Sequence, residues 1–211
     1  MELQLALDFV EMERALDLIA RTERSIDIFE AGTPLLLREG AGAVRKMRAS
    51  RPGIRILADA KIVDGGYGEA KMLFDAGADL VTVLAVASTE TLVAVQKAAE
   101  ESGGTVVADM IASADPAADL PRLSDAGIGV ACVHRPADSG SWKAENSRLL
   151  EEVAGSARAG GRLRIMVAGG ISLETVVSIL PLSPQIVVVG GSIVNAKDPA
   201  QAADELRRAL R

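Results

Sequence analysis

Carboxylates stand at or just beyond the ends of several short apolar runs in this sequence. They are Asp8, Glu30, Asp59, Asp64 and Asp109. Burying one such carboxylate without a partner is costly. A helix cap or an arginine partner would account for any single acid, but it accounts poorly for five together. We therefore expect these acids to share one site, and a divalent cation explains the cluster better than separate structural roles do.

Glu30 and Asp59 are the acids from which we predict a metal site. They follow successive apolar runs, which would be neighbouring strands of a sheet. Mg²⁺ in proteins is commonly held by one or two carboxylates and keeps several of its waters. The expected cofactor is therefore a Mg²⁺ ion shared by these two residues.

His134 is the single histidine of the chain, and it follows the sixth apolar run. A histidine at such a position is suited to proton transfer near neutral pH. Lys61 lies two residues after Asp59, and among so many acids it should keep its proton and act as an electrophile. Arg135 either reaches a substrate or pairs with a local acid such as Asp138, and the pairing is the interpretation that we favour.

Two pairs of glycines, in the segments VAGGIS and VVGGSI, separate an apolar run from the start of a helix-like segment. They are Gly169 with Gly170, and Gly190 with Gly191. Backbone N–H groups at such turns bind phosphate, and Ser192 could add a hydroxyl. Each pair alone would fit an ordinary turn. Their matched positions favour a phosphate site.

Short apolar runs alternate with longer amphipathic segments along the whole chain. The expected strands are Leu3–Leu7, Ile26–Phe29, Ile54–Ala58, Leu80–Leu84, Thr105–Ala108, Gly129–Val133, Leu163–Ala168 and Ile186–Val189. The expected helices are Glu11–Arg21, Leu37–Ala49, Gly68–Ala76, Thr89–Glu101, Ala117–Asp125, Lys143–Arg158, Leu173–Leu180 and Pro199–Leu210. Strict alternation of this kind predicts parallel strands joined by right-handed crossovers.

Eight such units in 211 residues predict an α/β protein with the architecture of a single compact (β/α)8 TIM barrel, one domain over residues 1–211. A doubly wound open sheet is the alternative. In a barrel the catalytic groups lie at the carboxyl ends of the strands. The polar segment Gly140–Ser147 follows the sixth run, and its Trp142 either covers the site or packs on a helix. Cys132, inside the sixth run, is expected in the core.

Composition excludes several other classes of protein. The chain is 49% hydrophobic but only 2% aromatic, which suits parallel strands buried on both faces. One cysteine cannot build a disulfide framework, and the net charge of −6 with scattered basic residues argues against a nucleic-acid partner. Neither a membrane-length apolar run nor a signal-peptide pattern is evident, so we expect a cytoplasmic protein without a membrane partner.

The sequence resembles the family of 3-hexulose-6-phosphate synthase and 3-keto-L-gulonate-6-phosphate decarboxylase, within the orotidine monophosphate decarboxylase suprafamily. The resemblance runs from residue 3 to about residue 204 and is carried by the segments LQLALD, EAGTPLLLREG, LADAKIVDGG, AGADLVTVL, ADMI, CVH, VAGGIS and VVVGGSI. Its most specific element is the D-x-K-x-x-D pattern of Asp59, Lys61 and Asp64.

The resemblance implies a homodimer of barrels with shared active sites and a phosphorylated ketose as substrate. It implies that Glu30 and Asp59 bind Mg²⁺, and that Asp8 and Lys61 contact the sugar phosphate. Asp64 would reach the partner subunit's site and His134 would be the acid/base group. The glycines after the last two strands would hold the phosphate.

Features of the two branches of the family are mixed in this chain. Asp109 in ADMIA resembles the synthase branch, as does Gly191 where the decarboxylase branch carries an arginine. After His134 the chain reads RPADSG, which departs from both branches: Arg135 matches the decarboxylase pattern, while Pro136 and Gly140 replace the Gly and Gln of the synthase.

We therefore expect a Mg²⁺-dependent aldolase that condenses D-ribulose 5-phosphate with formaldehyde through an enediolate. The alternatives are a decarboxylase-like lyase, a paralogue acting on another ketose phosphate and a non-catalytic sugar-phosphate-binding protein.

Overall fold

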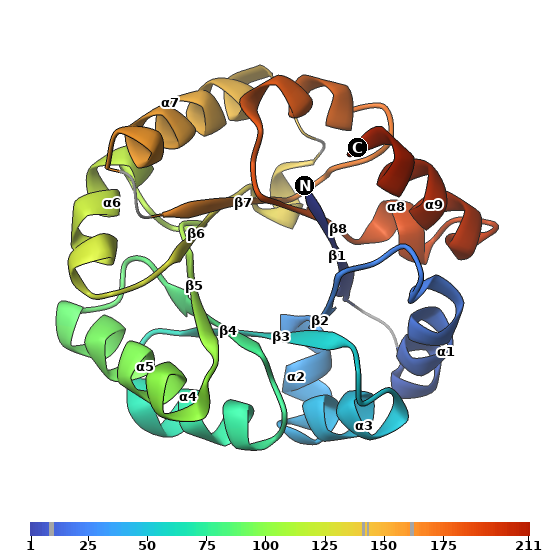
Figure 1. The fold of residues 1–211 in the computed structure, drawn as a ribbon, viewed down its shortest axis with the longest axis horizontal. Coiled ribbons are helices and arrows are strands. Elements are labelled where there is room, and N and C mark those ends of the chain that lie inside the picture. The colour runs from blue at the N-terminus through green and yellow to red at the C-terminus, as the bar shows by residue number, and fades with distance from the viewer. Residues whose placement is uncertain (9–10, 141, 143, 161–162) are drawn as a thin grey trace.

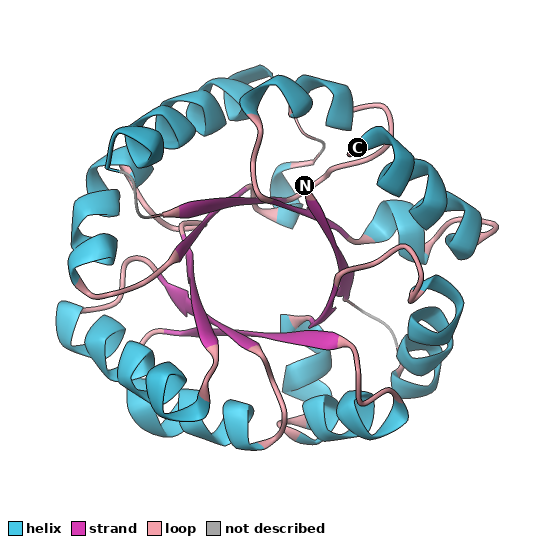
Figure 2. Ribbon diagram, viewed as in Figure 1, coloured by secondary structure: helices cyan, strands magenta, loops and turns pink. Residues whose placement is uncertain are grey.

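Runs of β-branched and aliphatic residues form the strands of a closed barrel (Figures 1 and 2). The computed structural model describes residues 1–8, 11–140, 142, 144–160 and 163–211. Within these residues the strands are β1 (Glu2–Leu7), β2 (Ile28–Ala31), β3 (Arg55–Ile62), β4 (Leu80–Leu84), β5 (Thr105–Asp109), β6 (Val130–His134), β7 (Arg164–Ala168) and β8 (Ile186–Val189). Each pairs in parallel with the next, and β8 closes on β1. The barrel prediction is confirmed and the open sheet is excluded.

Alternate residues of each strand face the interior of the barrel and form their own apolar cluster. It comprises Ala6, Ile28, Leu57, Leu80, Val107, Val130, Cys132, Met166, Ala168, Ile186 and Val188. The residues between them point outward and pack against the helices in a second, larger cluster. This period of two explains the scarcity of aromatic residues, because small and branched side chains fill both layers.

The helices form a ring outside the strands (Figure 2). They are α1 (Met12–Thr22), α2 (Thr33–Glu39), α3 (Gly42–Ser50), α4 (Gly66–Asp75), α5 (Thr89–Ser102), α6 (Pro116–Asp125), α7 (Ala144–Gly160), α8 (Gly191–Val194) and α9 (Pro199–Ala209), with the 3₁₀ turns η1 (Ala137–Ser139), η2 (Val176–Ser178) and η3 (Leu180–Leu182). Lys143, the expected first residue of one helix, lies outside the described residues, as does Ser141 of the polar loop. In the described part of the chain, no helix has the length and apolarity that crossing a membrane requires.

Two helix predictions were wrong. The expected helix Leu37–Ala49 is two helices, because Gly40 takes a backbone φ of 59° and ends α2 before α3 begins. The expected helix Leu173–Leu180 is two 3₁₀ turns instead. Pro181 restricts the residue before it, and the β-branched Val176 and Val177 add little helix propensity.

Four strands extend further at their carboxyl ends than the sequence suggested, and all four changes affect the site. Strand β5 includes Asp109, and strand β6 includes His134. Strand β2 runs to Ala31, so Glu30 lies within it rather than after it. Strand β3 runs to Ile62 and includes both Asp59 and Lys61. Its pairing with β4 shifts register between Ala58 and Ile62, which marks a β-bulge at the mouth of the barrel.

Candidate active site

The carboxyl ends of the strands surround a small cavity in the barrel mouth, of about 20 Å³. Its polar lining comes from β1 to β6: Gln4, Glu30, Asp59, Thr82, Asp109, Cys132 and His134. A volume of this size is enough for roughly one water molecule. The structure thus brings together four of the residues that we selected from the sequence, namely Glu30, Asp59, Asp109 and His134.

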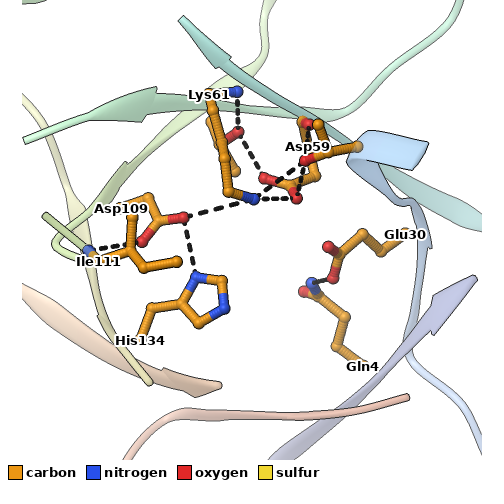
Figure 3. Close-up of polar contacts among 9 residues, drawn as sticks. Gln4, Glu30, Asp59, Lys61, Asp109, Ile111 and His134 are labelled. Carbon is orange, nitrogen blue, oxygen red and sulfur yellow. Dashed lines mark hydrogen bonds and ion pairs between the residues drawn. The ribbon is translucent and has the colours of Figure 1, made fainter. Parts of the chain in front are cut away.

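Asp59 and Lys61 form an ion pair at the bulge of β3 (Figure 3). Thr33 Oγ1 donates to Asp59 Oδ2 over 2.6 Å, and Thr82 Oγ1 donates to Asp59 Oδ1 over 2.9 Å. Burial alone would raise the pKa of Asp59, but the ammonium of Lys61 and these hydrogen bonds lower it. Burial likewise opposes the charge on Lys61, yet Asp59, Asp109 and Glu30 raise its pKa. The pair is therefore charged at neutral pH, as expected for an electrophilic lysine.

Lys61 has an unusual backbone conformation, with a φ of 49° in the left-handed region. Residues other than glycine rarely adopt it, because the side chain crowds the backbone. The backbone N–H of Lys61 donates to Thr82 Oγ1 over 2.9 Å. One buried hydroxyl thus holds both the strained backbone of Lys61 and the carboxylate of Asp59.

His134 and Asp109 form a second polar pair on the neighbouring strands β6 and β5. His134 Nδ1 lies 2.9 Å from Asp109 Oδ2, and Asp109 Oδ1 accepts from the backbone N–H of Ile111 over 3.0 Å. Asp109 is only 3% exposed, so its orientation is fixed. A carboxylate at Nδ1 favours the tautomer with the proton on that nitrogen. The other ring nitrogen then faces the open centre of the barrel (Figure 3).

Glu30 lies across the cavity from His134, and it has a different environment from Asp59 (Figure 3). Its Oε2 accepts a hydrogen bond of 2.6 Å from Gln4 Nε2, and no described cation lies within 4 Å of it. Burial first, and then the negative charges of Asp59 and Asp8, raise its pKa well above the ordinary value. Gln4 Oε1 is buried and has no hydrogen-bond partner among the described residues. Neither of these buried oxygen groups therefore has a cationic partner among the described residues.

Asp8 follows β1 at the rim of the mouth. Burial and the nearby Asp59 raise its pKa, although Lys61 and His134 act in the opposite direction. The backbone of Gly32 packs closely against Asp8. A Cβ placed on Gly32 would lie 2.0 Å from Asp8 Oδ1. Asp8 is thus held at the edge of the cavity, where a bound molecule could meet it.

The two glycine pairs lie at the ends of β7 and β8, as predicted. Gly169 and Gly170 have φ values of 102° and 69°, which other residues rarely adopt. A Cβ on Gly169 would also lie 2.1 Å from the backbone oxygen of Arg135. Gly191 begins the short helix α8. Ser192 Oγ donates to the backbone oxygen of Ile171 over 2.9 Å, which ties the two turns together, so its predicted contact with phosphate stays a prediction.

The favoured pairing of Arg135 with Asp138 was wrong. Arg135 is 4% exposed, and among the described residues its guanidinium donates to the backbone oxygen of Pro136 alone, over 3.3 Å. Within the described ranges no carboxylate oxygen lies within 4 Å of it. Its role in substrate binding stays a prediction. Gly140 at the end of η1 passes near the guanidinium, since a Cβ placed on it would lie 3.6 Å from a terminal nitrogen of Arg135.

Three further residues have clear positions. Asp64 is exposed beyond the end of β3 and accepts from the backbone N–H of Gly65, so the structure does not bring it to the cavity of its own chain. Trp142 is buried and donates from Nε1 to Ser147 of α7 over 3.0 Å, so it packs on a helix rather than over the mouth. Cys132 is buried as expected, and it faces the cavity.

Sequence reasoning missed Gln4, Thr33 and Thr82 because none of them is ionisable. The period of two could have found two of them. Gln4 lies four residues before Asp8 on the same face of β1, and Thr82 follows the inward-facing Leu80 by two. Thr33 lies in the first turn of α2 and has no such signal.

The fold and the site together define a (β/α)8-barrel enzyme whose acids, lysine and histidine converge at the carboxyl ends of the strands. The chain belongs to the orotidine 5'-phosphate decarboxylase / HUMPS family, whose model matches residues 1–206. It is a carbon–carbon lyase of this family.

Individual relatives agree with this assignment over their full length. The chain is 33% identical to 3-hexulose-6-phosphate synthase from Bacillus subtilis (strain 168), with 100% of this chain and 99% of the relative aligned. It is similar to the crystal structure of 3-hexulose-6-phosphate synthase from Salmonella typhimurium, with a TM-score of 0.91, 40% identity, and coverage of 100% and 98%. It is also similar to a crystal structure of KGPDC from Streptococcus mutans, with a TM-score of 0.88, 28% identity, and coverage of 98% and 97%.

Proposed function

We propose that this protein is a Mg²⁺-dependent aldolase that condenses D-ribulose 5-phosphate with formaldehyde to give 3-hexulose 6-phosphate. One observation carries the proposal: a histidine oriented by a buried carboxylate faces Glu30 across a cavity that also adjoins the ammonium of Lys61. That arrangement can remove a proton beside a carbonyl group and stabilise the anion that forms. The full-length similarity to 3-hexulose-6-phosphate synthases supports the choice of substrates.

The donor set in the mouth fits a hard divalent cation. Glu30 is a buried carboxylate whose pKa is raised well above the ordinary value by burial and by the neighbouring acids, and Gln4 Oε1 is buried and unpartnered. Oxygen ligands of these kinds suit Mg²⁺. Glu30 and Asp59 would hold the ion, and when bound it would act as a Lewis acid toward the oxygens of the ketose.

His134 is the proposed acid and base. With a proton on Nδ1 toward Asp109, its Nε2 has a free lone pair that faces the cavity. Nε2 takes the C1 proton, and the electrons of the C1–H bond form the double bond of a C1–C2 enediolate. C1 then attacks the carbon of formaldehyde, and the new alkoxide recovers the proton from His134. No proton or electron is gained or lost overall.

Lys61 stabilises the negative charge that develops on the enediolate. Its ammonium lies 3.7 Å from Asp109 Oδ2 and forms the ion pair with Asp59. A fixed charge of this kind contributes most where the charge of the transition state appears, because the protein need not reorganise around it. Thr82 and the bulge of β3 hold the ammonium in that position.

The phosphate is proposed to bind at the turns after β7 and β8. Gly169, Gly170, Gly190 and Gly191 carry no side chain, and backbone N–H groups can approach an anion closely where no side chain intervenes. The rim acid Asp8 would receive a hydroxyl of the sugar. Bound in this way, the ketose would have C1 and C2 toward His134 and Lys61.

A homodimer in the cytoplasm completes the proposal. Asp64 points away from its own cavity, and the chain beside it exposes apolar side chains: Val63 is 54% exposed, Tyr67 38% and Met72 60%. Exposed apolar groups beside a polar one are typical of an interface. In a two-fold dimer each subunit would present Asp64 to the partner's mouth.

Decarboxylation of 3-keto-L-gulonate 6-phosphate is the second candidate, and Arg135 is the observation that favours it. Its buried guanidinium has no carboxylate partner in the described part of the chain, so the carboxylate of a sugar acid could supply one. The similarity to KGPDC from Streptococcus mutans agrees with this alternative. Both reactions would pass through an enediolate of a phosphorylated ketose.

A direct activity screen separates these candidates. Ribulose 5-phosphate with formaldehyde, and 3-keto-L-gulonate 6-phosphate alone, are each incubated with the enzyme, with and without Mg²⁺. We expect condensation of the first pair, dependent on Mg²⁺. Turnover of the second substrate alone would select the decarboxylase. If neither substrate is turned over, exchange of the C1 proton of ribulose 5-phosphate with solvent separates the remaining candidates. Exchange would indicate a paralogue that acts on another ketose phosphate, and no exchange would indicate a binding protein.

A further inference from the structure

Cys132 lies in the mouth of the barrel beside two residues of the site, and the mechanism does not use it. One ligand atom from each of Asp109, Cys132 and His134 lies within 4.8 Å of the other two. From this cluster we infer that the barrel contains a second cation site, selective for thiolate-binding divalent metals such as Zn²⁺ and Co²⁺. It is distinct in its donor atoms from the oxygen set of Gln4, Glu30 and Asp59.

The sheet itself brings the three ligands together. Asp109 on β5 lies directly opposite Cys132 on β6 in the parallel register. His134 follows Cys132 by two residues, so both side chains face the interior. The Cys-x-His pair on one strand and the Asp on its neighbour therefore converge without any loop. Because strands are rigid, the site needs only side-chain rotation to close around an ion.

The donor atoms determine which metals the cluster prefers. A thiolate, an imidazole nitrogen and a carboxylate oxygen are the ligands of zinc sites, and three protein ligands with one open position are typical of accessible ones. Mg²⁺ prefers oxygen ligands and would gain nothing from the sulfur. The two donor sets in the mouth therefore discriminate between classes of metal.

The charge in the mouth also favours a dication. Four carboxylates, those of Asp8, Glu30, Asp59 and Asp109, are offset by the single ammonium of Lys61. Binding replaces the proton of the Cys132 thiol with the metal, and that proton leaves to solvent. No oxidation or reduction takes place. Burial first, and then the nearby acids, raise the pKa of the Cys132 thiol well above its ordinary value. A bound divalent ion offsets both effects, because its charge stabilises the thiolate.

A bound metal would block catalysis because it shares two residues with the site. His134 could not act as a base while its ring nitrogen is coordinated, and Asp109 would no longer orient the ring. Zinc would thus inhibit the enzyme through His134 and Asp109 rather than through Glu30. The inhibition rests on the proposed function, whereas the binding does not.

Cobalt provides a direct test of the binding. The chain has one cysteine, so any thiolate-to-cobalt charge-transfer absorption must come from Cys132. Co²⁺ is titrated into the reduced full-length protein in excess Mg²⁺, and the near-ultraviolet absorption is followed. We expect a band that saturates at one equivalent and disappears on addition of Zn²⁺. Its absence in the wild-type protein would overturn the site, whatever the enzyme's activity.

Variants then separate the site from other effects of the metal. Cys132→Ser should lose the band and the inhibition by Zn²⁺ while it keeps its catalytic activity, and His134→Asn should weaken the band by removing a second ligand. Cys132→Ala serves in its place if the serine variant does not fold. Inhibition by Zn²⁺ that is as strong in the Cys132 variants as in the wild type would show that zinc acts at the oxygen set, and the inference would fail.

Discussion

The acidic side chains at the two ends of the barrel differ in whether arginines pair with them. At the amino end the acids pair with arginines: Glu2 contacts Arg55 and Arg164 at 2.5 Å each, and Asp27 pairs with Arg207. Arg48 similarly pairs with Asp79 at 2.5 Å. At the carboxyl end Glu30 and Asp8 have no such partner among the described residues, and Asp59 and Asp109 share one lysine.

The difference shows which acids serve the fold and which serve the site. Arginine can satisfy a carboxylate with two parallel hydrogen bonds. An acid paired with arginine therefore serves the fold and needs no ligand. The pKa of Glu2 shows this, since the two arginines lower it although burial opposes them. Glu30 shows the reverse, because burial and its neighbours raise its pKa. An acid left in that state is available to a ligand.

Replacement of His134 should produce the largest effect at the carboxyl end. His134→Asn keeps the size and polarity of the side chain but removes the group that accepts the proton. We expect kcat for condensation to fall by roughly 10²–10⁴-fold, the usual contribution of general acid–base catalysis. Phosphate and metal binding should persist, which isothermal titration can measure. An unchanged kcat would show that the proton goes elsewhere, with Lys61 or Asp109 as the next candidates.

Thr82 should be the next most sensitive position, although it is not ionisable. Thr82→Val keeps the shape but removes the hydroxyl that holds Asp59 and the backbone of Lys61. Loss of a hydrogen bond to a charged group corresponds to about 1.5–3 kcal/mol, so kcat should fall by about ten- to a hundredfold. Steady-state kinetics should show the loss in kcat more than in KM, and Thr82→Ser should restore it.

Thr105 offers a matched control at the amino end, because it begins β5 and forms no side-chain hydrogen bond in the described structure. Thr105→Val should leave kcat unchanged. Equal losses in the two valine variants would mean that the effect is one of general stability, and the positioning role of Thr82 would be lost.

Gly191 tests the phosphate site with a smaller effect. A Cβ there would lie 3.4 Å from the flexible amide of Asn195, so Gly191→Val should fold, yet its side chain would cover the backbone N–H groups at the turn. We expect KM for the phosphorylated substrate to rise by roughly tenfold or more, as for loss of a hydrogen bond to a charged group. Gly155→Val on α7, where a Cβ meets nothing within 4 Å, is the control. A similar KM in both variants would show that the phosphate does not bind at this turn.

The same substitution at the two ends should change stability in opposite directions. In metal-free protein, Glu30→Gln removes a buried charge without a cationic partner and should stabilise the fold by about 1–3 kcal/mol. Each kcal/mol corresponds to roughly 2–4 °C in Tm for a chain of this size. Glu2→Gln weakens two partly exposed ion pairs and should cost about 0.2–1 kcal/mol. Thermal unfolding in a chelator measures both, and a loss of stability in Glu30→Gln would contradict the comparison.

The pH dependence of these two variants should also differ. The folded-state pKa of Glu30 is raised, so the native wild type loses stability as pH rises above 4.5, the ordinary value, and the advantage of Glu30→Gln grows over that range. The folded-state pKa of Glu2 is lowered, so its contribution is present above 4.5 and lost as pH falls below it. If the free energies of unfolding of the two variants changed in parallel with pH, the environments of Glu30 and Glu2 would not differ.

The sequence could predict the barrel and most of the acids of the site, because the position of a residue at the carboxyl end of a strand is readable from the apolar runs. It could not predict the bulge at Lys61, since no glycine marks it and a tertiary contact from Thr82 stabilises it. Nor could it separate paired from unpaired acids. Glu2 and Glu30 are the same residue type beside similar strands, and only the fold brings Arg55 and Arg164 to one of them.

Arg135 shows the same limit from the opposite side. Asp138 is a near neighbour in sequence, which made an ion pair a reasonable expectation. The turn of η1 instead directs the backbone oxygen of Pro136 toward the guanidinium, and no acid approaches it within the described residues. Local spacing predicts contacts well within helices and strands, but poorly in a loop whose course depends on a proline and a glycine.

The exchange of the C1 proton of ribulose 5-phosphate tests the central claim most directly, because it isolates the step assigned to His134. The enzyme is incubated with ribulose 5-phosphate in D₂O with Mg²⁺ and without formaldehyde, and the C1 signals are followed by proton NMR. We predict that the wild type exchanges one C1 proton with solvent and that His134→Asn does so at a rate roughly 10²–10⁴-fold lower. No exchange by the wild type, or equal rates in the two proteins, would contradict the account.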